Sequence, residues 1–205
     1  MLRTWHRFQG QINIPLNDNG KDQARKTSEY LRNISFNKAF SSSMNRPYET
    51  AQIILQNNKD LKIEKINSLV EISHGLWEGK LESEIRKKWP LLLKNWHDKP
   101  EEVKMPEGES IKDVSERSVK AFNKICLSQK DNDLSLLVAH DAVNKTLICN
   151  ILGINYSNIW MIKQGNGGIT IIDLFEDPSK PPVISALNIT THLGGIIDST
   201  ASGAL

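Results

Sequence analysis

The stretch that decides the fold reads Leu134-Ser135-Leu136-Leu137-Val138-Ala139-His140-Asp141. It is an almost unbroken apolar run that ends on a histidine, and a helical pattern follows it directly. Short apolar runs of this kind are typical of strands buried on both faces of a parallel sheet. Because ligands of such sheets bind just beyond the carboxyl ends of the strands, His140 is predicted to lie at a functional site.

Strands and helices alternate on both sides of this run. The spacing of apolar residues predicts helices over 17–34, from Pro47 onward, over 81–96 with an interruption at Pro90, over 110–125 and over 141–152. Further strands are predicted over 38–41, 61–66, 168–175 and 183–189, and a polar loop over 97–109. This alternation predicts an α/β fold, a three-layer sandwich whose mostly parallel sheet carries helices on both faces.

Length and composition indicate one domain over residues 1–205, because 205 residues with 39% hydrophobic content can bury one sizeable core. A net charge of +2, from 26 basic and 24 acidic residues, leaves no broad footprint for nucleic acid. The sequence has no apolar run of the ~18 residues needed to cross a bilayer, so we expect no membrane partner and a cytoplasmic location. Cys126 and Cys149 stand far apart and outside any metal-ligand spacing, which favours reduced core residues and no metal site.

Four polar segments are predicted to meet at one end of the sheet, at residues 7–11, 41–50, 71–79 and 140–141. Arg46 stands where a strand leads into a helix, and both the helix amides and the guanidinium fork suit phosphate oxygens. Glu71 precedes two glycines that let a backbone approach a ligand, and a partly buried Glu has the raised pKa of a general acid.

Each of these residues alone also has a purely structural explanation. Arg46 alone fits a surface ion pair, Glu71 a capping carboxylate, and His140 a core histidine; His74 fits an exposed loop position better than a partner of Glu71. The order of the motifs decides between the two interpretations. It runs Ser-Ser-x-x-x-Arg-x-x-x-Thr-Ala, then Glu-x-x-x-Gly-x-Trp-Glu-Gly, then Pro-x-Gly-Glu-Ser, and finally an apolar strand that ends in His.

In this order the motifs resemble those of the histidine phosphatase superfamily, the phosphoglycerate mutase-like proteins. Residues 7–17 resemble the family segment Gly-Arg-x-Gln-Gly-x-x-Asp-x-Pro-Leu, and residues 42–51, 71–79 and 106–110 resemble its next three blocks. Residues 138–141 resemble the second histidine block, in which Gly is commoner than Asp after the His. Several further stretches look most like cyanobacterial members, among them residues 139–147, 164–168 and 188–195.

The resemblance implies phosphoryl transfer from a small phosphomonoester through a histidine, without a metal or another cofactor. It implies that Arg46 binds phosphate, that Glu71 protonates the leaving oxygen, and that His140 hydrogen-bonds the phosphoryl oxygens. Gln9 and Gly10 would line the substrate side. The expected partner is thus a small-molecule phosphate ester, and a homodimer is plausible by the same resemblance.

The family's first block, Arg-His-Gly at the end of the first strand, has no counterpart in this sequence. Its histidine is the nucleophile, so covalent catalysis would lack its central group. One interpretation is a chain truncated at its N-terminus relative to the family, with the first central strand missing and two neighbouring strand edges unpaired. The other is a catalytically inactive pseudoenzyme that acts as a phosphate-ester binding or interaction module. His6 is the remaining candidate for a substitute nucleophile.

Overall fold

The computed structural model describes residues 7–58, 60–177 and 179–194, so His6 lies outside the described residues. Its centre is a parallel three-stranded sheet of order β2-β1-β3, built from β1 (Lys38–Ser42), β2 (Ile63–Ile66) and β3 (Ser135–Val138). In register, Ser41 lies opposite Val138 and Ser42 opposite Ile66. All three strands therefore end at the same edge of the sheet.

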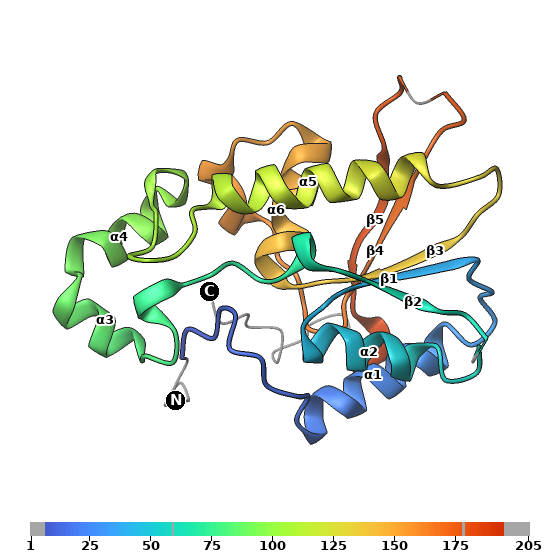
Figure 1. The fold of residues 1–205 in the computed structure, drawn as a ribbon, viewed down its shortest axis with the longest axis horizontal. Coiled ribbons are helices and arrows are strands. Elements are labelled where there is room, and N and C mark those ends of the chain that lie inside the picture. The colour runs from blue at the N-terminus through green and yellow to red at the C-terminus, as the bar shows by residue number, and fades with distance from the viewer. Residues whose placement is uncertain (1–6, 59, 178, 195–205) are drawn as a thin grey trace.

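Helices cover both faces of this sheet, as Figure 1 shows. On one side lie α1 (Asp18–Tyr30) and α2 (Asn45–Ile54), and on the other α5 (Ile111–Leu127) and α6 (Asp141–Leu152). The predicted layered α/β fold is thus confirmed. The first helix ends four residues before its predicted end at Ile34, because the chain after Tyr30 closes tighter turns, with the Arg32 N–H bonded to the Glu29 carbonyl at 3.3 Å.

The last two strands do not extend the parallel sheet. β4 (Ile169–Asp173) and β5 (Val183–Ile189) pair antiparallel with each other in a sheet of their own. Within the described part of the chain, β3 pairs only with β1. The prediction that β3 is fully buried is therefore wrong: its four residues are half-buried, because β3 is an edge strand of the described sheet.

The predicted helix over 81–96 is interrupted as expected. It consists of α3 (Glu82–Lys88) and α4 (Pro90–Asp98), with Trp89 in a non-helical conformation (φ -135°, ψ 59°) between them. The loop predicted over 97–109 contains the end of α4 and a short 3-10 helix (Pro100–Glu102), and it is not simply polar surface. Val103 and Met105 are each 1% exposed, because their side chains complete the core beside Trp96.

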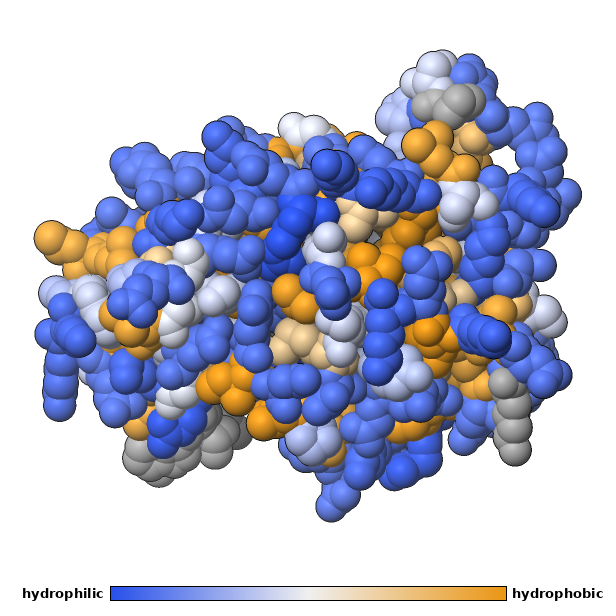
Figure 2. Space-filling model, in the orientation of Figure 1, coloured by the Kyte–Doolittle hydropathy of each residue, from blue (hydrophilic) through white to orange (hydrophobic). Residues whose placement is uncertain are grey.

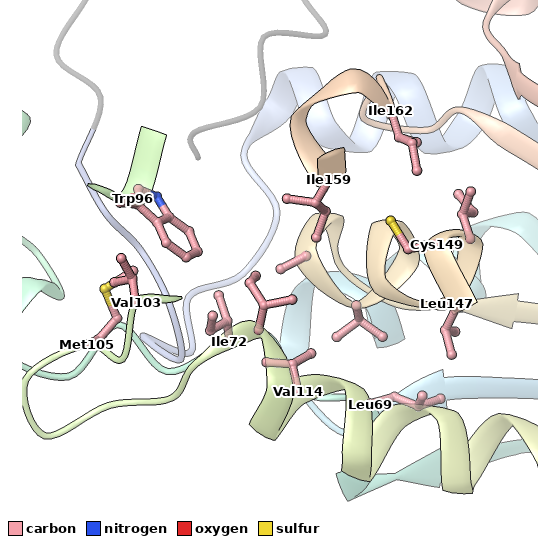
Figure 3. Packing of buried hydrophobic residues seen from close by; sticks show 14 of the residues in the cluster. Leu69, Ile72, Trp96, Val103, Met105, Val114, Leu147, Cys149, Ile159 and Ile162 are labelled. Atoms are coloured by element: carbon pink, nitrogen blue, oxygen red, sulfur yellow. The ribbon is translucent and has the colours of Figure 1, made fainter. Parts of the chain in front are cut away.

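The hydrophobic core reaches directly under the loop that follows β2. Leu69 and Ile72 are fully buried, and Figure 3 shows Ile72 between the Val103–Trp96 group and Val114 of α5. Burying an aliphatic side chain of this size contributes roughly 1.5–3 kcal/mol. These two residues therefore fix the depth of the intervening Glu71 in the protein.

The face of the molecule seen in Figure 2 is mainly hydrophilic, with hydrophobic surface showing between the elements near its middle. The exposed apolar side chains include Ile171, Val183 and Leu187 of the β4–β5 hairpin, where outward and inward residues alternate along β5. Among the described residues, no helix is long and apolar enough to cross a membrane.

The main chain at Gly75, in the loop after β2, leaves no room for a side chain. It has a φ of +52°, and a Cβ there would lie 2.1 Å from the Pro106 carbonyl oxygen. Gly153, which ends α6, has a φ of +65° with open space around it. We expect Gly153→Ala to cost about 1 kcal/mol, from backbone strain alone, and Gly75→Ala roughly 3 kcal/mol or more, because main chain must move.

Urea unfolding of the two variants measures this difference. Equal losses in the free energy of unfolding would show that the contact between Gly75 and Pro106 does not hold the loop.

Candidate active site

The carboxyl ends of the three parallel strands bring the predicted site residues together. β1 ends at Ser42, and Arg46 is the second residue of α2, which follows it. Glu71 lies in the loop after β2, and His140 lies between β3 and α6. The His140 Nε2 atom and the Ser42 Oγ atom are 2.9 Å apart, in hydrogen-bond contact across the β1–β3 pair.

Glu71 is a buried carboxyl, 8% exposed. Burial raises its pKa to about 7, and the charge of Asp141 adds to the effect. The N–H groups of Ile72 and Ala142 donate to the carboxylate and lower the pKa, as does the charge of Arg46, but burial outweighs them. About half of the Glu71 side chains therefore carry a proton at neutral pH, which is the condition a general acid requires.

His140 is a buried, neutral imidazole. Burial lowers its pKa to about 3, and the positive charges of Arg46 and Arg117 act in the same direction. A neutral imidazole has one N–H donor and one acceptor nitrogen, and Ser42 Oγ engages Nε2. An anion placed between His140 and Arg46 would raise the pKa of His140, because a negative charge favours the protonated ring.

Arg46 is half-buried, and its Nη1 donates to the Ile12 carbonyl at 3.4 Å. Burial lowers its pKa, and the nearby Glu71 carboxylate opposes this change. The guanidinium stays charged, because arginine is not deprotonated in proteins. The first amide of helix α2, that of Asn45, donates to Asn13 Oδ1 at 2.7 Å, and Pro47 has no N–H. Arg46 therefore offers its guanidinium and its own main-chain N–H at the start of the helix.

The N-terminal segment, which holds Gln9 and Gly10, contacts the loop that carries Glu71. Gln9 is exposed, and Gly10 is buried in a turn that the Gln11 N–H ties to Glu78 Oε1 at 3.0 Å. The side chain that reaches Glu71 is that of Gln11, whose Nε2 donates to the Glu71 carbonyl at 2.9 Å. Gln11 belongs to the segment 7–11 that the sequence predicts at the site, but its contact with Glu71 was not predicted, because the two residues are 60 apart in sequence.

An ion pair lies beside the site. Lys145 Nζ is 3.0 Å from Asp141 Oδ2, one turn apart on α6, and Lys145 is 8% exposed. Burial raises the pKa of Asp141, while Lys145 lowers it. The sequence signal for this pair was the spacing of four residues in the helix after His140.

The expectation that His74 is an exposed loop residue is wrong. His74 is 1% exposed and packs edge-on against Phe8 and Trp96, with ring centroids 5.0 and 6.1 Å away. Burial lowers its pKa to about 4. It is a neutral core residue under the Glu71 loop, because the aromatic side chains exclude water from it.

Replacement of Glu71 by Gln is expected to stabilise the empty protein at alkaline pH. Because burial raises the pKa of Glu71 from 4.5 to about 7, the folded state binds more protons than the unfolded state between these values. The free energy of unfolding contributed by Glu71 thus falls as pH rises through this window, and the loss is complete above it. Glu71→Gln should gain at most about 3 kcal/mol near pH 8.5 and nothing at about pH 4.

Urea unfolding at both pH values measures the gain, with the exposed Glu116→Gln as the control. A gain that is the same at the two pH values would contradict a raised pKa at Glu71.

Comparison with known proteins places this chain in a family. The model of the histidine phosphatase superfamily (branch 1) matches residues 3–189. Phosphoserine phosphatase 1 of Hydrogenobacter thermophilus is 32% identical over 188 residues, which cover 92% of this chain and 87% of that protein. The probable phosphoglycerate mutase GpmB of an Enterobacter species is 29% identical, with 84% and 79% covered. Among solved structures, Bacillus stearothermophilus YhfR superposes with a TM-score of 0.85 at 25% identity, over 92% of this chain and 91% of that one. The chain therefore belongs to the histidine phosphatase superfamily, branch 1.

Proposed function

We propose that this protein binds small phosphate monoesters at Arg46 and His140, and that Glu71 donates a proton to the leaving oxygen in phosphoryl transfer. One observation carries the proposal: a buried carboxyl with a pKa of about 7 lies beside an arginine and a neutral histidine at the strand ends. The relatives' names support the substrate class, since phosphoserine and phosphoglycerate are both small phosphate esters.

Each residue has a distinct part in this proposal. The Arg46 guanidinium and the Arg46 main-chain N–H, in the first turn of α2, hold the phosphoryl oxygens, whose charge increases during transfer. His140 donates a hydrogen bond to the same oxygens and gains a proton as the dianion binds. The phosphorus forms a bond to the oxygen of water or another hydroxyl as its bond to the leaving oxygen breaks. Glu71 gives its proton to the departing alkoxide, which is otherwise a poor leaving group. Gln9 and Gly10 line the substrate side of the site, and the neighbouring Gln11 holds the Glu71 carbonyl.

Arg46→Ala should weaken binding of inorganic phosphate by roughly 30-fold, because a charge-assisted hydrogen bond contributes about 2 kcal/mol. Titration calorimetry near pH 7 measures the dissociation constant. Arg25→Ala removes an exposed arginine of α1 that pairs with Asp22, and it should leave the constant unchanged. Equal effects of the two substitutions would place the phosphate elsewhere.

A second candidate function is phosphate-ester binding without turnover. Of the histidines in residues 7–58, 60–177 and 179–194, only His140 contacts the site: His74 is in the core, His97 is in the last turn of α4, and His192 stacks on Tyr30. Metal-free hydrolysis of p-nitrophenyl phosphate separates the two functions. If the wild type hydrolyses the ester and the Glu71→Ala and His140→Ala variants do not, the protein is an enzyme. If calorimetry detects phosphate binding but no hydrolysis occurs, it is a binding protein.

Phosphate binding should raise the pKa of His140 well above its value of about 3 in the empty protein. The reason is that a bound dianion stabilises the imidazolium and offsets the effect of Arg46. Ring chemical shifts followed by NMR against pH, with and without phosphate, measure the change. His74 is the internal control, because it lies in the aromatic core and its pKa of about 4 should not move. An unchanged His140 would contradict its proposed contact with phosphate.

A further inference from the structure

Arg117 extends from the seventh position of α5 to the loop that carries Glu71. Its Nη1 donates to the carbonyl oxygens of Ser68 at 2.9 Å and of Val70 at 2.6 Å. Its Nη2 donates to the carbonyl oxygen of Glu71 itself at 3.0 Å. One guanidinium thus binds three main-chain oxygens within four residues of the loop.

Glu109 accepts the other two donors of the same guanidinium. The Nε atom lies 2.7 Å from Oε1 of Glu109, and Nη2 lies 2.8 Å from Oε2. All five N–H groups of Arg117 therefore have an acceptor, which is the full capacity of the side chain. Glu109 Oε2 also accepts the Ser73 N–H at 2.9 Å, so the pair binds both ends of the segment 68–73.

Only an arginine suits this arrangement of acceptors. The three carbonyls and the Glu109 carboxylate converge on one planar group, whereas a lysine presents three N–H bonds from a single nitrogen. The side chains of Arg117 and Glu109 are 19% and 22% exposed, so water screens the pair little. Leu69 and Ile72 fix how deep the loop lies, but apolar packing does not set the direction of its carbonyls.

We propose that Arg117, paired with Glu109, is a positioning residue that fixes the main chain around Glu71 and so keeps its carboxyl buried beside Arg46. The proposal rests on the proposed function, in which Glu71 supplies the proton. Arg117 acts through the loop and does not itself contact the phosphoryl group.

Weakening the Arg117–Glu109 contacts with the loop is expected to change the charge of the Glu71 carboxyl. The charged groups around the Glu71 carboxyl are Arg46 from α2, Asp141 and its partner Lys145 from α6, and Arg117 behind the loop. A mobile loop lets water reach the carboxyl, which then ionises at lower pH. The ionised carboxylate repels a bound anion. The pH dependence of anion affinity therefore reports on the position of Glu71.

Sulfate is the probe, because it keeps its double charge across the pH range while phosphate does not. Its affinity is measured by calorimetry from about pH 5 to about pH 9 in the wild type, Arg117→Lys and Glu109→Gln. Each variant is also made with Glu71→Gln, so that the part due to Glu71 is separated from the part due to His140. The matched control is Arg86→Lys, an exposed arginine paired with Glu82 on α3.

The pH at which Glu71 ionises appears as a midpoint in the plot of sulfate affinity against pH. Arg117→Lys and Glu109→Gln should each lower this midpoint by at least about one unit below 7, which weakens sulfate binding near pH 7 about fivefold. The shift should vanish in the Glu71→Gln background, and Arg86→Lys should not move the midpoint. If the pH midpoint of sulfate affinity is unchanged in Arg117→Lys while its urea unfolding midpoint falls, the proposal is overturned. Arg117 would then have only a structural role.

A wild-type protein that binds neither sulfate nor phosphate would contradict the proposed function but not the role of Arg117. In that case carbon NMR of the Glu71 carboxyl decides, since its titration needs no ligand. The same downward shift in Arg117→Lys supports the positioning role, and an unshifted titration overturns it.

Discussion

Parallel pairing of β1 with β2 on one side and β3 on the other is the constraint on which the site depends. Parallel strands end at one edge of a sheet, so the three loops that follow them must meet there. The register places Ser41 opposite Val138, and the chain then brings Ser42 and His140 into hydrogen-bond contact. Because a shift of one residue would turn the side chains to the other face, this pairing decides which groups converge.

Desolvation sets the chemical character of the groups that converge. Burial raises the pKa of Glu71 to about 7 and lowers that of His140 to about 3, so both are largely uncharged in acidic solution just below neutrality. Arg46 is then the main charge beside them, and the anion of the proposed function would compensate it. The empty site holds poorly solvated polar groups at the expense of folding stability, which is the usual condition of a site built for a charged ligand.

The elements around the sheet were largely predictable from sequence. The capped helix α5, the interruption at Pro90 and the end of α6 at Gly153 follow from short-range rules, because caps, prolines and left-handed glycines act within one turn. The burial of Val103 and Met105 was not predictable. Their neighbours in sequence are polar, and only packing against Trp96 from α4 shows that they belong to the core.

The sequence by itself determined the α/β class and the positions of Arg46, Glu71 and His140 at strand ends, since periodicity and motif order are local properties of the chain. Tertiary structure alone decided that β4 and β5 form a separate antiparallel pair, that Gln11 and not Gln9 reaches Glu71, and that His74 is buried. It also decided that Arg117 binds the Glu71 loop from 46 residues away in sequence. Such contacts depend on which segments the fold brings together, and desolvation exists only once they have packed, so no local pattern encodes them.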